Sequence, residues 1–168
     1  MISIEIFTED KIDDVMEFET ELRKQEPGIY FMDAGEGYRQ QLRESFHDPR
    51  FCNALSLLAY KNGKVIGRID ATLLGSRSDA CCCSAYLDWI CVLKQERHHK
   101  VAQLLLKELR NALKQKNVET LIGIVASNEE SRRFYAAVEN ASIHDEAIWT
   151  LFSWTGYGSH SGFRNPFR

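Results

Sequence analysis

The sequence contains no apolar run approaching the roughly 20 residues that a helix needs to cross a bilayer. The first residues also lack the basic and then apolar layout of a signal peptide. With only three prolines, long disordered linkers are not expected either. We therefore expect a cytoplasmic protein with no membrane partner.

An excess of positive charge is also missing, because 21 Lys and Arg residues face 24 Asp and Glu residues and give a formal net charge of −3. Nucleic-acid binding usually requires a strongly basic face or tail, so we do not expect that class of partner. The five cysteines are an odd number, and Cys81, Cys82 and Cys83 are adjacent. This spacing suits neither a disulfide framework nor a zinc site, so we expect reduced thiols and no metal.

The pattern of apolar residues predicts a single domain over residues 1–154, followed by a Gly- and Ser-rich tail over residues 155–168. Alternating apolar residues predict strands, and 3.6-residue spacing predicts helices. Asn62-Gly63 supplies the positive φ angles of a tight hairpin turn, and Ser127 with Glu130 fits a capping box. The expected strands cover residues 2–6, 53–60, 64–74, 85–93, 119–126, 142–145 and 147–154, and the expected helices cover residues 10–24, 38–47, 101–113 and 128–138.

The most informative segment, residues 87–113, passes from an apolar strand through the basic loop Glu96-Arg97-His98-His99-Lys100 into an amphipathic helix. The first N–H groups of a helix have no partner inside it, and the helix dipole places partial positive charge there. Arg97 and Lys100 add full charges. The segment therefore predicts a site for a phosphate-bearing cofactor. His98 and His99 lack the spacing of metal ligands on a helix, which also speaks against a catalytic metal.

This order of elements resembles the GNAT superfamily of acetyl-coenzyme A-dependent N-acetyltransferases over nearly the whole domain. Residues 92–102 look like the family's pattern Val-x-x-x-x-Arg-Gly-x-Gly-x-Gly or Ala, with His98 and Lys100 standing where glycine is usual. Residues 128–135 are similar to the family's Asn-x-x-Ala-x-x-Phe-Tyr. The resemblance implies an α/β (α+β) fold with a mixed, mostly antiparallel central sheet of about six to seven strands, flanked by about four helices.

The resemblance also implies where acetyl-CoA binds. The main chain of one strand would pair with the pantetheine arm like an added strand, and the basic loop with the helix start would hold the diphosphate. Without glycine at position 100, the Lys100 ammonium would offer a point charge to a phosphate instead. The implied cofactor-binding residues are Ile90, Cys91, Val92, Arg97, His98, His99, Lys100, Val101, Ala102 and Asn128.

Acetyl transfer from a thioester to an amine requires a base for the amine and a proton for the departing thiolate. The resemblance places Tyr135 near the coenzyme sulfur, and its phenol carries a proton at neutral pH. We expect Asp88 to be the general base, with a pKa raised by burial beside Leu87 and Trp89. Asp70 on the preceding strand is the second candidate, and the sequence does not decide between the two.

Acidic and aromatic loop residues are the candidates for binding a cationic acceptor. They are Tyr30, Phe31, Asp33 and Glu36, together with Asp70. We therefore expect an acyltransferase that passes the acetyl group of acetyl-CoA to a primary amine of a small molecule or peptide by direct attack on the thioester. The alternative is a CoA-binding sensor or regulatory module with weak or no turnover, suggested by Lys100 and by Glu139 after the last helix. The aromatic closing strands and tail are compatible with a homodimer.

Overall fold

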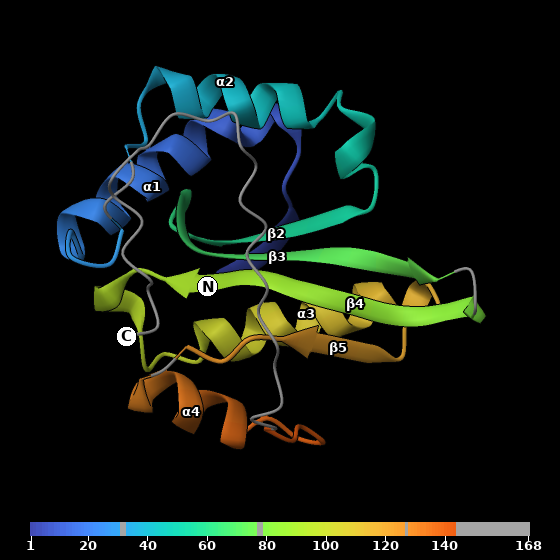
Figure 1. Ribbon diagram of the computed structural model, residues 1–168. Coiled ribbons are helices and arrows are strands. Elements are labelled where there is room, and N and C mark those ends of the chain that lie inside the picture. The colour runs from blue at the N-terminus through green and yellow to red at the C-terminus, as the bar shows by residue number, and fades with distance from the viewer. Residues whose placement is uncertain (31–32, 77–78, 127, 144–168) are drawn as a thin grey trace, which may run out of the picture. The chain divides into compact units, whose positions relative to one another are not determined.

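The computed structural model describes residues 1–30, 33–76, 79–126 and 128–143 (Figure 1). The chain divides into two compact units, one covering Met1–Gly123 and the other beginning at Ile124, and each is described by itself. The domain boundary that the sequence predicts at residue 154 lies outside the described residues.

The first unit is built on one mixed sheet of five strands in the order β1-β2-β3-β4-β5. The first three pairings are antiparallel and the pairing of β4 with β5 is parallel, which confirms a mixed, mostly antiparallel sheet. Five described strands are fewer than the expected six to seven. The two strands predicted over residues 142–154 lie outside the described residues, except for Ser142 and Ile143, which are not in a strand. The strands are β1 (Ile2–Ile6), β2 (Ala54–Lys61), β3 (Lys64–Ser76), β4 (Asp79–Val92) and β5 (Thr120–Gly123).

The tight turn between β2 and β3 is the one that the sequence predicts. Asn62 and Gly63 both have positive φ angles, 52° and 76°, and Lys61 pairs with Lys64 across the turn. This backbone matches the right-handed twist of the flanking strands.

Strands β3 and β4 extend beyond their predicted ends into the polar residues that were expected to form a loop. The ladder continues through Leu74 paired with Ser84 and Ser76 paired with Asp79. Long antiparallel pairing satisfies the backbone N–H and C=O groups of these residues, so their low apolar content does not end the strands.

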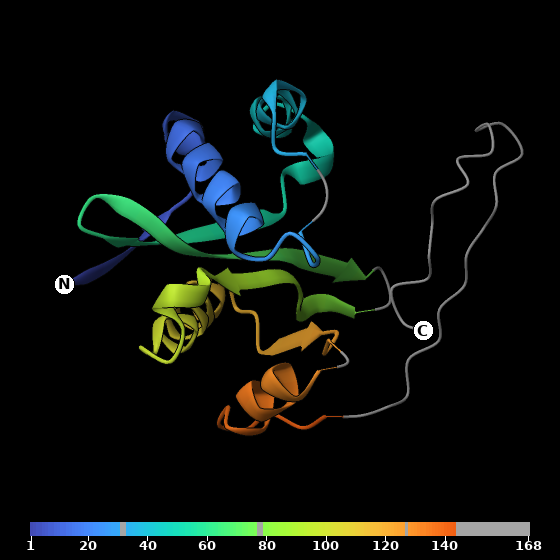
Figure 2. The ribbon, with the colours of Figure 1, turned by 90° about the vertical axis from the view of Figure 1, so that its left-hand side faces the viewer.

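Helices cover both faces of the sheet (Figure 2). Successive residues of β3 face opposite sides of the sheet. A Cβ added at Gly67 would lie 3.1 Å from Leu105 of the helix Val101–Gln115 on one side, whereas Arg68 reaches Glu19 of the helix Ile12–Gln25 on the other at 3.3 Å. The helices of this unit are α1 (Ile12–Gln25), α2 (Glu36–Ser45) and α3 (Val101–Gln115), with 3₁₀ turns at Glu9–Lys11, Pro49–Phe51 and Lys94–Glu96. The largest fully buried apolar side chains are Phe18, Leu22, Leu58, Ile69, Leu105 and Leu109.

The second unit contains helix α4 (Glu129–Ala136). Its N-cap is Asn128, whose Oδ1 accepts a hydrogen bond from the Ser131 N–H at 2.8 Å. The prediction that the helix is capped one residue earlier, at Ser127, is therefore wrong, because asparagine satisfies the same orphan donors. Within the described ranges, every helix is too short or too polar to span a lipid bilayer.

Candidate functional site

Strand β4 loses one of its two neighbours part-way along its length. Its parallel pairing with β5 covers Ser84 to Leu87, whereas its pairing with β3 continues to Val92 (Figure 1). Within the described strands, Ile90, Cys91 and Val92 therefore have a neighbour on one side only. A strand edge of this kind presents backbone N–H and C=O groups to an extended ligand. This edge is the one at which the sequence predicts the pantetheine contacts.

A β-bulge lies where β4 and β5 part. Asp70 pairs with Trp89 and Ala71 pairs with Leu87, so Asp88 has no partner on β3. The Asp88 carboxylate accepts a hydrogen bond from the Thr72 hydroxyl at 2.6 Å, and the residue is exposed. The expected burial of Asp88 is therefore wrong, because the bulge redirects its side chain.

The second candidate base lies in a different environment. The Arg68 Nε is 3.1 Å from one carboxylate oxygen of Asp70 and 2.9 Å from the other. Both side chains are largely buried, with exposed fractions of 10% for Arg68 and 15% for Asp70. Asp70 is thus held by a guanidinium, and Asp88 is the carboxylate more accessible to an incoming amine.

Arg68 is the centre of a polar cluster between the sheet and the helices α1 and α2. Its Nη1 donates to Glu19 at 3.3 Å and to the Tyr38 hydroxyl at 3.1 Å, and its guanidinium carbon lies 5.5 Å from the centre of the Trp89 ring. Burial acts against the guanidinium charge, but Asp70 and Tyr38 outweigh it and raise the pKa of Arg68. The cluster fixes the orientation of Asp70 and Trp89.

The predicted acceptor residues are only partly brought together. The Tyr30 ring packs edge-to-face on Trp89 at 6.1 Å, and burial raises the pKa of Tyr30. Asp33 and Glu36 are exposed, and Phe31 lies outside the described residues. Trp89 was not among the predicted site residues. It connects two of them, because its ring packs on Tyr30 and it pairs in register with Asp70 on β3.

The basic loop keeps the backbone of a glycine-containing loop although it has no glycine. His98 and Lys100, at the two positions where the family usually has glycine, both have a φ of 63°. The left-handed region costs a residue with a Cβ roughly 1–2 kcal/mol. The sequence thus departs from the pattern in side chain but not in backbone conformation.

Helix α3 begins without a side-chain cap. Lys100 occupies the N-cap position and its side chain makes no capping hydrogen bond. The N–H groups of Val101 and Ala102, in the first turn, therefore have no partner within the helix. The side chains of His98, His99 and Lys100 are exposed around this terminus. The residues present fit an anionic group such as a diphosphate.

Arg97 is oriented differently from the other residues of the basic loop. Its Nη1 donates to Glu26 Oε1 at 3.0 Å, its Nη2 donates to Glu26 Oε2, and its Nε donates to the Val92 carbonyl at 3.3 Å. The side chain that was predicted to meet phosphate is thus directed towards a carboxylate at the end of α1.

In the second unit, Tyr135 lies on α4 and is half-buried. Its ring packs against Phe134 with centroids 5.0 Å apart, and burial raises its pKa. The phenol therefore keeps its proton throughout the neutral range. Asn128, the other predicted residue of this unit, uses its side-chain oxygen for the helix cap.

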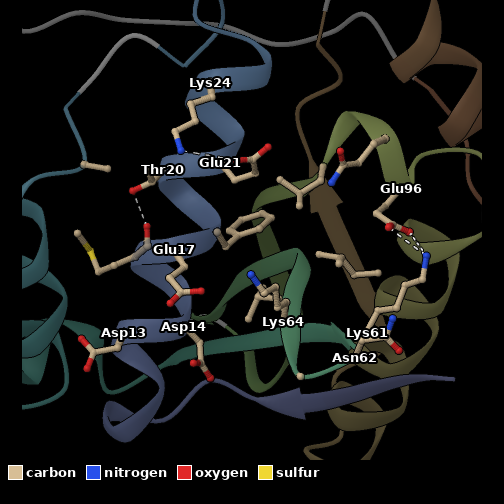
Figure 3. A pocket seen from close by; sticks show the side chains of 18 of the residues that line it. Asp13, Asp14, Glu17, Thr20, Glu21, Lys24, Lys61, Asn62, Lys64 and Glu96 are labelled. Carbon is tan, nitrogen blue, oxygen red and sulfur yellow. Dashed lines mark hydrogen bonds and ion pairs between the residues drawn. The ribbon is translucent and has the colours of Figure 1, made fainter.

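A groove of about 1240 Å³ lies along α1, beside the β2–β3 turn (Figure 3). The carboxylates of α1 line one side, and Lys61, Asn62 and Lys64 line the other. Lys61 Nζ is 3.0 Å and 2.7 Å from the two carboxylate oxygens of Glu96. Of the predicted site residues that the structure describes, Glu36 alone lines this groove, so its volume does not identify the cofactor site. Among the described residues, no group of three or more His, Cys, Asp or Glu side chains could hold a metal ion.

The comparison with protein families identifies the family of this chain. Residues 13–138 match the model of the Acetyltransferase (GNAT) family, and the chain belongs to that family. It is therefore an acetyltransferase, and its cofactor is acetyl-CoA.

Solved structures share the fold at low sequence identity. An aminoglycoside acetyltransferase from an uncultured soil metagenomic sample has a TM-score of 0.70 at 13% identity, covering 92% of this chain and 99% of its own. A ribosomal-protein-alanine N-acetyltransferase from Brucella melitensis biovar Abortus 2308 has a TM-score of 0.69 at 14% identity, covering 90% and 99%. AAC(6')-Iy, in complex with the bisubstrate analogue CoA-S-monomethyl-acetylneamine, has a TM-score of 0.69 at 15% identity, covering 92% and 99%. No curated protein matches the chain.

The left-handed conformation of Lys100 generates a stability prediction. Lys100→Gly is expected to raise the free energy of unfolding by up to about 1 kcal/mol, because glycine adopts positive φ without the Cβ penalty. Urea denaturation measures the change. The matched control, Lys107→Gly at an exposed position within α3, is expected to lower the free energy of unfolding by about 1 kcal/mol. Equal destabilisation by both substitutions would contradict the assigned backbone strain.

Proposed function

We propose that this protein transfers the acetyl group of acetyl-CoA to a primary amine of a small molecule or peptide by direct attack of the amine on the thioester. One observation carries the proposal: the one-sided edge of β4 leads through residues 93–100 into the uncapped start of α3. An extended arm on that edge would be continuous with a diphosphate at the helix start. The two ends of the cofactor site thus lie on consecutive elements of the chain.

The helix start supplies donors for the diphosphate. The N–H groups of Val101 and Ala102 point out of the first turn, and the helix dipole favours an anion there. Lys100, His98 and His99 carry exposed side chains around the same position, and Lys100 adds a full positive charge. Bound acetyl-CoA supplies the acetyl group as an activated thioester.

The β4 edge and its bulge supply the groups that act on the amine and the carbonyl. An N–H of Ile90 to Val92 would polarise the thioester carbonyl. Asp88 would accept the proton that the amine loses as its C–N bond forms, directly or through water, with Thr72 orienting the carboxylate. From its place in the family-like motif of residues 128–135, we propose Tyr135 as the acid that gives its proton to the sulfur as the C–S bond breaks. A cationic acceptor first releases one proton to solvent, and the neutral amine then gives one proton to Asp88 while the thiolate gains one from Tyr135. Proton exchange with solvent restores both side chains, so the transfer is balanced.

The acceptor side favours a cationic amine. Asp88 is exposed beside the largely buried Asp70, and the rings of Tyr30 and Trp89 lie against each other nearby. Carboxylates attract an ammonium group and aromatic rings cover apolar parts of the same molecule. The named aminoglycoside and ribosomal-protein acetyltransferases of this fold support both a small-molecule and a peptide acceptor.

The function is tested by mixing the protein with acetyl-CoA and a panel of amines and by measuring free-thiol release. The panel contains polyamines, aminoglycosides and peptides with free amino termini. We expect thiol release that depends on at least one amine, and saturable acetyl-CoA binding in isothermal titration. Binding without thiol release from any amine would indicate the sensor alternative, and absence of binding would contradict both.

The proposed acid generates the next prediction. Tyr135→Phe is expected to lower kcat by about 100-fold or more while leaving the KM for acetyl-CoA within a few-fold, because a general acid acts only in the transition state. Burial raises the pKa of Tyr135, so its acidic form persists as the pH rises and kcat should not fall between about pH 7 and 9 through this residue. Phe134→Leu is the packing control. An unchanged kcat in Tyr135→Phe would remove the tyrosine from the mechanism.

The two carboxylates are separated by parallel substitutions. Asp88→Asn is expected to lower kcat/KM about 100-fold near neutral pH, with partial recovery at higher pH, where hydroxide can accept the proton that Asp88 no longer takes. Asp70→Asn is expected to lower the free energy of unfolding by about 1–3 kcal/mol, because Arg68 loses one of its two charged partners and keeps Glu19. Steady-state rates and urea denaturation measure the two effects. The reverse pattern would assign the base to Asp70.

A further inference from the structure

A bidentate ion pair joins two segments that lie 71 residues apart in the sequence. The Arg97 Nη1 donates to Glu26 Oε1 at 3.0 Å, and its Nη2 donates to Glu26 Oε2. The Glu26 side chain is 9% exposed and the Arg97 side chain 22%. Two parallel charge-assisted hydrogen bonds fix both distance and orientation, which makes this pair stronger than a surface ion pair.

Two more hydrogen bonds stabilise the same junction. The Arg97 Nε donates to the Val92 carbonyl at 3.3 Å, at the end of β4. The Lys94 backbone N–H donates to Gln25 Oε1 at 2.7 Å, at the end of α1. The guanidinium therefore bridges the last residue of β4 and the first residue after α1.

Glu26 also organises the turn that follows α1. Its N–H donates to the Leu22 carbonyl at 3.0 Å, and its own carbonyl accepts from the N–H groups of Ile29 and Tyr30, both at 3.0 Å. Tyr30 packs against Trp89 of β4. The residue whose carboxylate holds Arg97 is therefore also the residue whose backbone holds Tyr30, an aromatic ring on the acceptor side.

We propose that the ion pair of Glu26 and Arg97 is a clasp that sets the turn of residues 26–30 against the end of β4. Arg97 is then a positioning residue that holds the acceptor side and the cofactor side together, and it is not a phosphate ligand. To reach a diphosphate, the guanidinium would have to leave Glu26, and a largely buried carboxylate would lose its charged partner. The positive charge at the diphosphate comes from Lys100 and the helix start instead. The assignment of one side to the acceptor and the other to the cofactor rests on the proposed function.

The clasp is tested by the affinity of the full-length protein for coenzyme A, measured by titration calorimetry. The variants are Arg97→Ala, Glu26→Ala, the double alanine variant and the charge swap Glu26→Arg with Arg97→Glu. With a clasp, both single variants weaken binding by a similar factor of about 2–10, and the double variant is no worse than either, because each change removes the same interaction. The swap recovers part of the affinity.

A direct phosphate contact gives a different pattern. Arg97→Ala would then weaken coenzyme binding by more than about tenfold, while Glu26→Ala would leave it unchanged or tighten it by releasing the guanidinium. That outcome would overturn the clasp. Lys100→Ala is the matched control: it weakens coenzyme binding by the same factor whether Glu26 is present or replaced by alanine.

Two further measurements separate the clasp from the proposed function. Hydrogen exchange at the Ile29 and Tyr30 amides is expected to accelerate in Arg97→Ala and Glu26→Ala but not in Lys100→Ala, and this holds whether or not coenzyme A binds. Unchanged exchange in both clasp variants would overturn the clasp. In the transferase assay, the KM for the amine rises in the clasp variants more than kcat falls. If Arg97→Ala does not fold, Arg97→Lys, which keeps the charge but loses the fork, is expected to show the same exchange and KM changes more weakly.

Discussion

The site depends on one constraint: among the described strands, β4 pairs on both sides from Ser84 to Leu87 and on one side from there to Val92. Backbone donors and acceptors that lose a neighbouring strand must find another partner, and an extended ligand is the partner that fits a strand edge. Because the chain turns from this edge into α3, the same segment that leaves β4 incomplete ends at an uncapped helix terminus. Within the described part of the chain, the strand edge and the helix start thus belong to one continuous segment.

The bulge at Asp88 sets which side chains lie together at this edge. The Asp88 carboxylate accepts a hydrogen bond from Thr72, and the Trp89 ring contacts the Arg68 guanidinium. Thr72 and Arg68 lie on the same face of β3. The consecutive residues Asp88 and Trp89 therefore point to the same side of the sheet, as a bulge allows. Without the extra residue, strict alternation would send one of them to the α3 face. A carboxylate beside an aromatic ring at the point where β4 becomes free is therefore a product of one unpaired residue.

Local patterns predict much of this fold, and they fail where distant segments decide the outcome. The Asn62-Gly63 turn and the buried face of α3 follow from turn chemistry and periodicity, and both are confirmed. The exposure of Asp88 could not be predicted, because a one-residue shift in register has no signature in the strand itself. Arg97 in a basic loop is typical of a phosphate ligand. Its partner Glu26, 71 residues earlier, is found only when the chain is folded.

The clasp contributes to holding the basic loop in its strained backbone conformation. His98 and Lys100 persist in a left-handed conformation only if their surroundings over-determine it. On one side, the buried Val101, Leu105 and Leu109 hold α3 against the sheet. On the other, Arg97 is tied to Glu26 and Val92 immediately before the first strained residue. With both ends anchored, the loop cannot relax without breaking core packing or a largely buried ion pair. The clasp thus also preserves the backbone that leaves the first amides of α3 unpaired.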